Sequence, residues 1–150
     1  MNLAKLTNEN YEIATNILRD YWKNRGMPEY DKTWALDYLQ QGHKNETKND
    51  EFFVYQEQEI IGMVSLITDV SLVAQIRDLV VKPEFRGKGY GKKNFAGTNH
   101  SSNGAQAKKN LCTYNDDYEN FYISCGFEKE GLLKSHFMDG EDMIIMSKFL

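Results

Sequence analysis

Hydrophobic residues recur at helical spacing in the first part of the chain. Between Tyr11 and Trp22, aromatic and aliphatic side chains appear every three or four positions, which predicts an amphipathic helix that ends near Arg25-Gly26. A second helix is expected to follow and to end at Gly42. The polar residues 43–50 predict a loop, in which His43 is interpreted as a solvated side chain rather than a ligand.

Most other segments are short runs rich in Val, Ile, Phe and Tyr, which are typical of β-strands. The ranges that fit this pattern are 3–7, 51–56, 59–67, 72–81, 127–138 and 142–150. The short connections Glu57-Gln58 and Asp139-Gly140 indicate hairpins between neighbouring strands. Helices and strands together predict an α/β (α+β) fold.

The composition indicates one globular domain. With 150 residues, 41% of them hydrophobic and 13% aromatic, the chain can bury a core but is too short for two domains, so residues 1–150 are expected to form one. Because no apolar run approaches ~18 residues and the start encodes no secretion leader, a cytoplasmic location is expected. Cys112 and Cys125 form no C-x-x-C pair, so neither a metal nor a disulfide framework is expected.

A glycine-rich basic turn follows the strand that ends at Val81. Residues Arg86 to Gly91 read RGKGYG and directly follow LVVKPEF. Glycine allows positive φ and close approach of the backbone, and the helix start that follows offers unpaired N–H groups, a combination that binds anions. The spacing fits neither the P-loop, since Lys93 stands in place of its Ser or Thr, nor the dinucleotide fingerprint G-x-G-x-x-G. ATP and dinucleotides are therefore disfavoured ligands.

Charge is unevenly distributed along the chain. The net charge is −4, yet one short stretch holds five basic residues, namely Lys82, Arg86, Lys88, Lys92 and Lys93. A polyanion could dock there, while the acidic remainder would attract a cation. The alternative is that these side chains only solvate a loop and a helix start. Nucleic acid is not an expected partner.

Two blocks in the right order resemble the GCN5-related N-acetyltransferase (GNAT) family. The turn Arg86 to Gly91 matches the family pattern R-x-x-G-x-G. Asn115, then Tyr122 seven residues later, then Gly126-Phe127, is similar to the family pattern N-x-x-A-x-x-x-Y-x-x-x-G-F. The resemblance implies a mixed, mostly antiparallel sheet flanked by helices. It also implies direct transfer of an acetyl group from acetyl-CoA to a primary amine, without a covalent enzyme intermediate.

The resemblance also implies how acetyl-CoA, the co-substrate, would be held. Backbone N–H groups of the turn would bind its pyrophosphate, and the preceding strand and one asparagine would bind its pantetheine arm. The residues expected to make these contacts are Leu79, Val80, Val81, Arg86, Gly87, Lys88, Gly89, Tyr90, Gly91, Lys92 and Asn115. Family members often pair as dimers, so a homodimer is one assembly that the resemblance allows.

Tyr122 is the candidate general acid. A phenol with a reference pKa of ~10 can protonate a thiolate of similar basicity as it leaves. The alternative is a tyrosine that only packs in the core. Tyr118 stands where the family usually has a small residue, and it could crowd the co-substrate or turn outward.

Asp78 is the candidate general base for the acceptor amine. It lies on the strand beside the expected thioester site, although strand alternation could equally turn it away, and a structural or substrate-orienting carboxylate fits as well. Gln75 stands where some family members carry a glutamate base, so bulk water is a further alternative. Polyamines, amino acids, antibiotics and protein amines all stay open as acceptors, with a small cation favoured by charge.

The segment Asn94 to Lys109 contradicts the resemblance. The family has an amphipathic helix here, whereas these residues include one Phe and no Leu, Ile, Val or Met, which predicts a loop. Permitted codons read one nucleotide later can encode an apolar helix, so two compensating frameshifts are one explanation and natural divergence is the other. The competing function is therefore a non-catalytic acyl-CoA-binding or interaction module.

Overall fold

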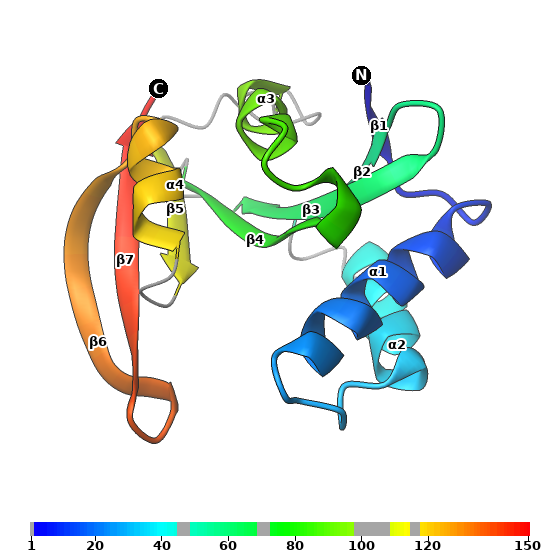
Figure 1. The fold of residues 1–150 in the computed structure, drawn as a ribbon, viewed down its shortest axis with the longest axis horizontal. Helices are drawn as coiled ribbons and strands as arrows, with labels where there is room; N and C mark the ends of the chain where they lie inside the picture. Colours follow the sequence, from blue (N-terminus) through cyan, green and yellow to red (C-terminus); the bar gives the residue numbers. More distant parts are fainter. Residues whose placement is uncertain (1, 45–48, 69–72, 98–108, 115–117) are drawn as a thin grey trace.

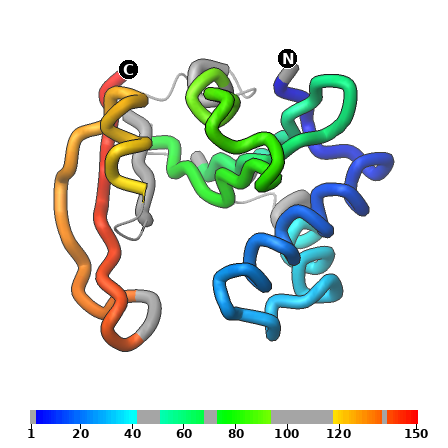
Figure 2. Tube along the Cα trace, viewed as in Figure 1, coloured from blue at the N-terminus to red at the C-terminus, as the bar shows by residue number. Residues whose placement is uncertain are grey.

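The computed structural model describes residues 2–44, 49–68, 73–97, 109–114 and 118–150 (Figure 1). Its elements are β1 (Asn2–Lys5), α1 (Tyr11–Asn24), α2 (Lys32–Lys44), β2 (Asn49–Gln56), β3 (Ile60–Thr68), β4 (Val73–Val81), the short 3-10 helix η1 (Pro83–Phe85), α3 (Tyr90–Gly97), β5 (Lys109–Tyr114), α4 (Glu119–Ser124), β6 (Glu128–Met138) and β7 (Glu141–Phe149). Figure 2 traces the chain from the α1–α2 pair on one side of the view to the β6–β7 hairpin on the other.

The strands form one sheet in the order β1-β2-β3-β4-β5-β7-β6. All neighbouring strands in these ranges pair antiparallel except β4 and β5, which pair parallel. The expectation of a mixed, mostly antiparallel sheet flanked by helices is confirmed. In Figure 1, β3 and β4 run across the view, whereas β5, β7 and β6 stand nearly upright beside them.

Two apolar cores lie on opposite faces of this sheet. Along β2 the side chains alternate, so that Phe52 and Val54 pack with α1 and α2, while Phe53 and Tyr55 pack with the residues of α4. We call these two sides the α1–α2 face and the α4 face. The helical and strand patterns of the sequence therefore correspond to one sheet with a layer of helices on each of its two faces.

Two local expectations were wrong. α2 does not stop at Gly42 but continues to Lys44, so His43 lies in its last turn and not in a loop. The segment expected to be a loop is helical from Asn94 to Gly97, as part of α3, and Lys109 begins β5; residues 98–108 lie outside the described ranges. Local propensity disfavours glycine in a helix by only about 1 kcal/mol, which tertiary contacts easily exceed. None of the helices in the described ranges is long and apolar enough to span a membrane.

Candidate active site

The parallel strands β4 and β5 separate partway along their length. Their register runs from Val73 opposite Lys109 to Ile76 opposite Cys112, and no later residue of β4 has a partner on β5 within the described ranges. The other edge of β4 stays paired with β3, and Lys82 continues that ladder by donating its N–H to the Ile61 carbonyl at 2.9 Å. β4 beyond Ile76 therefore borders a split in the sheet.

The residues predicted to hold pantetheine lie along this split. They are Leu79, Val80 and Val81, the last three residues of β4. Val80 and Val81 pair with Met63 and Gly62 of β3, so only the opposite backbone edge of the strand is left for a ligand. Asn115, the remaining predicted contact, lies outside the described residues.

The glycine-rich turn presents a run of unbonded N–H groups. Gly87 and Gly89 have φ of 74° and 78°, in the left-handed region that favours glycine. Within the described ranges, no N–H group from Gly87 to Lys92 donates to a backbone acceptor, and the first that does is that of Lys93, which bonds the Gly89 carbonyl at 3.1 Å. These groups lead into the N-terminus of α3, as an anion site requires.

Gly91 is required for a different reason. A Cβ built on Gly91 would lie 3.0 and 3.1 Å from two ring atoms of Phe121, so the start of α3 packs closely against α4. Tyr90, next to it, packs against the core of the α4 face. The three glycines of the turn thus combine two backbone conformations with one close contact between helices.

Arg86 is used differently from the prediction. Its N–H donates to the Pro83 carbonyl at 3.1 Å, so that group is not available to a phosphate. Its side chain folds back, and Nε donates to the Val81 carbonyl at 2.8 Å. Arg86 therefore joins the end of β4 to the turn, and its remaining guanidinium N–H groups, not its backbone, are the groups that could contact an anion.

A β-bulge sets the direction of Asp78. Ser65 pairs with Arg77 and Met63 pairs with Val80, so two residues of β4 stand opposite one residue of β3. Asp78, at φ 48°, is the extra residue in the left-handed region. Strict alternation from Ile76 would place its side chain on the α4 face, but the bulge turns it to the α1–α2 face instead.

On that face the carboxylate of Asp78 is held by two hydroxyl groups. Tyr38 Oη, from α2, and Ser65 Oγ, from β3, each donate a hydrogen bond to Asp78 Oδ2 at 2.7 Å. Burial raises the pKa of Asp78, and the hydrogen bonds from Tyr38 and Ser65 and the positive charge of Arg77 oppose that rise. Burial and the charge of Asp78 in turn raise the pKa of Tyr38, which therefore stays protonated as the donor.

Tyr21 of α1 connects this carboxylate to residues of other elements. Burial raises the pKa of Tyr21, the positive charge of Arg25 lowers it, and Tyr118 and Asp78 raise it further. Arg25 Nη1 donates to Tyr21 Oη at 3.3 Å, and Arg25 Nη2 lies 4.0 Å from Glu141 Oε2 of β7. Side chains from α1, α2, β4, β7 and the start of α4 thus gather around one region.

Tyr122 lies on the opposite face of the sheet from Asp78. It is a residue of α4, is 8% exposed, and packs edge-to-face against Phe121 and Phe127 with centroid separations of 5.1 and 5.6 Å. It belongs to the core of the α4 face. Tyr118, at the N-terminal end of α4, is 40% exposed and thus turns outward enough to reach solvent.

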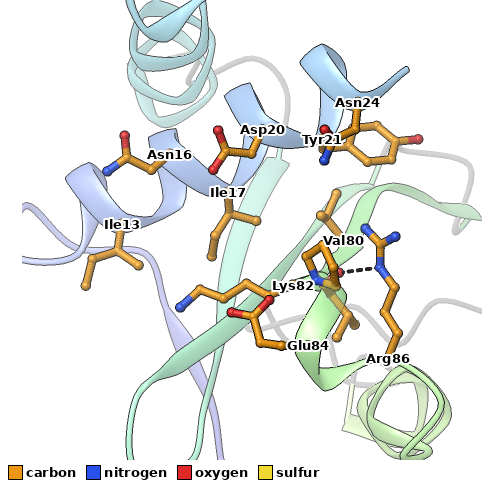
Figure 3. Close-up of a pocket in the computed structure, with 12 residues that line it drawn as sticks. Ile13, Asn16, Ile17, Asp20, Tyr21, Asn24, Val80, Lys82, Glu84 and Arg86 are labelled. Atoms are coloured by element: carbon orange, nitrogen blue, oxygen red, sulfur yellow. Dashed lines mark hydrogen bonds between the residues drawn. The ribbon is translucent and has the colours of Figure 1, made fainter. Parts of the chain in front are cut away.

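A pocket of about 270 Å³ lies between α1 and the end of β4 (Figure 3). Asn16, Asp20 and Asn24 line it from α1, and Lys82 and Arg86 line it from the β4–α3 connection. The spacing i, i+4 and i+8 places the three α1 residues on one helix face, but the same pattern is typical of any solvated helix surface and does not mark a pocket. No sequence pattern signalled Tyr38 or Ser65.

The described ranges contain no group of three or more His, Cys, Asp or Glu side chains arranged to bind a metal ion. The donors that are present, backbone N–H groups at a helix start beside basic side chains, suit a pyrophosphate. The split beside β4 offers unpaired strand backbone to an amide-containing chain such as pantetheine. These residues therefore fit coenzyme A.

Comparison with solved structures finds the same fold. An aminoglycoside 6'-N-acetyltransferase in complex with coenzyme A superposes with a TM-score of 0.82 at 14% identity, over 99% of this chain and 97% of that chain. A ribosomal-protein-alanine N-acetyltransferase from Brucella melitensis gives 0.77 at 16% identity over 100% of both chains. A mutant spermidine N-acetyltransferase from Vibrio cholerae gives 0.77 at 18% identity, over 99% and 95%.

Sequence comparison identifies the family. No curated protein matches the chain. A family model described as an acetyltransferase (GNAT) domain matches residues 48–129, more than half of the sequence, from β2 through the turn and α4 to the start of β6. The chain therefore belongs to the GNAT acetyltransferase family.

Proposed function

We propose that residues 1–150 form one N-acetyltransferase domain that transfers the acetyl group of acetyl-CoA to a primary amine by direct attack. The observation that carries this proposal is the continuity between the split beside β4 and the unbonded N–H groups from Gly87 to Lys92. Together they lead from unpaired strand backbone, which suits a pantetheine arm, to N–H groups that suit a pyrophosphate. Family membership and the fold support the same reaction.

Acetyl-CoA, when bound, supplies an activated thioester carbonyl. The chain would bind its pyrophosphate with the N–H groups of Gly87, Lys88, Gly89, Tyr90, Gly91 and Lys92 and with the side chain of Arg86. The free edge of β4 from Leu79 to Val81 would pair with its pantetheine and polarise the carbonyl. Asn115 would assist there.

Two side chains would handle protons. Asp78 would accept a proton from the attacking ammonium group, and Tyr122 would donate a proton to the leaving thiolate. Asp78 lies on the α1–α2 face, two residues beyond the point where β4 leaves β5, and Tyr122 lies in the core of the α4 face. In this proposal the substrate crosses the split and meets both side chains.

The acceptor is an amine in this proposal. The solved relatives are named for aminoglycosides, spermidine and a ribosomal-protein alanine, which share an amino group and little else. The carboxylate of Asp78 and the aromatic ring of Tyr38 beside it favour a cationic amine over a neutral one.

The test combines binding and turnover. Calorimetric titration with acetyl-CoA should give micromolar binding, and free thiol should appear when a panel of amines is added. Tyr122→Phe should bind acetyl-CoA within about twofold of wild type but lose about 100-fold in kcat. Tyr55→Phe, which removes a hydroxyl from the same core, is the matched control and should keep its turnover.

Two results would contradict the proposal. Tight acetyl-CoA binding without thiol release for any amine would favour the non-catalytic binding module. Unchanged kcat in Tyr122→Phe would leave Tyr122 as a core residue and require another proton donor.

A further inference from the structure

The carboxylate of Asp78 is hydrogen-bonded at one oxygen only. Tyr38 Oη and Ser65 Oγ both donate to Oδ2 at 2.7 Å. No hydrogen bond to the other oxygen, Oδ1, comes from the described residues. Two donors on one oxygen fix the carboxylate plane while leaving the lone pairs of Oδ1 for a further partner.

We propose that Tyr38 and Ser65 are positioning residues, which anchor Asp78 through Oδ2 so that Oδ1 is the atom that takes the proton of the acceptor amine. This inference rests on the proposed function. It goes beyond it by assigning two residues, from α2 and β3, that no sequence motif marks. It also separates the two carboxylate oxygens into an anchored one and a reactive one.

Both donors are themselves rigidly placed. Ser65 is 1% exposed in the middle of β3. The Tyr38 ring stacks on Trp34 at 5.2 Å with an interplanar angle of 7°, and meets Phe52 edge-on at 5.9 Å. Packing on two sides leaves the phenol few rotamers, so its hydroxyl is held where Asp78 needs it.

The anchor also explains how a strained residue keeps one conformation. A non-glycine residue at φ 48° costs about 1–2 kcal/mol, and it persists only when its surroundings hold it. The two hydrogen bonds to Oδ2 supply that constraint from two neighbouring elements. Without them the bulge could relax and carry Asp78 away from the split.

The proton transfer balances without further reagents. An N–H bond of the ammonium group breaks and its proton passes to Asp78 Oδ1, so that the nitrogen lone pair can form the C–N bond with the thioester carbonyl carbon. The C–S bond breaks, the thiolate takes the proton of the Tyr122 hydroxyl, and the new amide nitrogen loses its second excess proton to water. Solvent then returns a proton to Tyr122 and removes one from Asp78.

The groups that face Asp78 set the expected pH response. They are Tyr38 from α2, Arg77 from β4 and Tyr21 from α1, with neutral Ser65 from β3. The hydrogen bonds and Arg77 favour the ionised carboxylate and oppose the effect of burial on its pKa. Loss of the Tyr38 hydroxyl should therefore raise the pKa of Asp78 and move the acidic limb of kcat/KM to higher pH.

The experiment compares Tyr38→Phe and Ser65→Ala with the control Tyr30→Phe. Tyr30 belongs to the same aromatic cluster, with its ring 4.6 Å from Trp34, but does not contact Asp78. Tyr38→Phe and Ser65→Ala should each lose about tenfold in kcat/KM on the acidic limb, with that limb displaced upward and with acetyl-CoA affinity unchanged. Tyr30→Phe should keep the wild-type profile.

A second measurement does not depend on turnover. Carbon-13 NMR titration of the aspartate carboxyl groups, with Asp78 assigned through Asp78→Asn, should show a higher pKa for Asp78 in Tyr38→Phe than in wild type. An unchanged pKa would overturn the inference, because the hydrogen bond would then not exist in solution.

The outcomes also separate this inference from the proposed function. If Asp78→Asn loses turnover while Tyr38→Phe leaves both profile and pKa unaltered, the anchor is overturned and the enzyme stands. If the pKa moves but the limb of kcat/KM does not, Asp78 is not the base and the inference fails. If no amine is acetylated by wild type, the proposed function fails, whatever the NMR titration shows.

Discussion

Gly89→Ala tests the proposed pyrophosphate site at its backbone. Gly89 has φ 78°, and a Cβ added there would meet no atom within 4 Å. The substitution therefore adds no clash, and its only direct cost is the left-handed conformation. That cost is about 1–2 kcal/mol for a residue with a Cβ.

The structure indicates where this cost will appear. The turn around Gly89 is exposed, and residue 89 is tied to α3 only through the hydrogen bond that its carbonyl accepts from Lys93, so the turn should relax when no ligand is bound. Binding must then restore the original conformation at a cost of about 1–2 kcal/mol, which corresponds to a rise of about fivefold to thirtyfold in the Kd for acetyl-CoA. The melting temperature should change little.

Gly140→Ala is the matched control. Gly140 has φ 82°, and a Cβ added there would likewise meet no atom within 4 Å, but it lies in the β6–β7 hairpin, where Met138 pairs with Glu141. The hairpin holds the residue in place, so the strain should lower the melting temperature and leave the Kd unchanged. Calorimetry and thermal unfolding of both variants give the comparison. Equal effects of both on the Kd, or an unaltered Kd in Gly89→Ala, would refute the role of the turn.

Three further substitutions probe other contacts. Gly91→Ala should destabilise the chain by about 1–2 kcal/mol, because its Cβ would lie 3.0 Å from the Phe121 ring. In a double-mutant cycle, Phe121→Leu should recover part of this loss. Additive effects of the two substitutions on the free energy of unfolding would contradict that contact. Tyr55→Phe should raise stability by about 1 kcal/mol in urea unfolding, because the buried Tyr55 hydroxyl has no hydrogen-bond partner within the described residues; a loss would mean that the hydroxyl is bonded. Burial raises the pKa of Asp78 in the folded state, so the contribution of this group to stability is full at acid pH and is lost as pH rises through the raised pKa. Asp78→Asn should therefore flatten the decline of the free energy of unfolding with pH. An unchanged slope of that free energy against pH would contradict the burial of this carboxylate.

The sequence predicted features that depend on local spacing. The strands, the hairpins and the family blocks around Gly87 and Tyr122 are all short-range patterns. The face on which Asp78 lies could not be predicted, because alternation from Ile76 gives the opposite face and only a bulge reverses it. Tyr38 could not be predicted as its partner, because the two residues are 40 positions apart and meet only once α2 packs on the sheet.

The turn illustrates the same limit at closer range. Glycine at 87 and 89 followed from the need for positive φ, whereas Gly91 is set by the ring of Phe121, thirty residues further along the chain. The predicted contact between the Arg86 N–H and the pyrophosphate is not available, because η1 uses that group to close its own turn on Pro83. Such bonds depend on backbone geometry that residue types alone do not fix.

The bulge at Asp78 links the two features on which the proposed chemistry depends. An extra residue in one strand bends that strand, and here it stands two residues beyond Ile76, the last residue of β4 that pairs with β5. β5 itself continues through Thr113 and Tyr114 beside β7, so the ladder ends because β4 turns away and not because β5 stops. The residue that bends β4 is also the residue whose carboxylate faces the α1–α2 side. The opening for the thioester and the proposed proton acceptor beside it thus follow from a single left-handed residue, which Tyr38 and Ser65 hold in place.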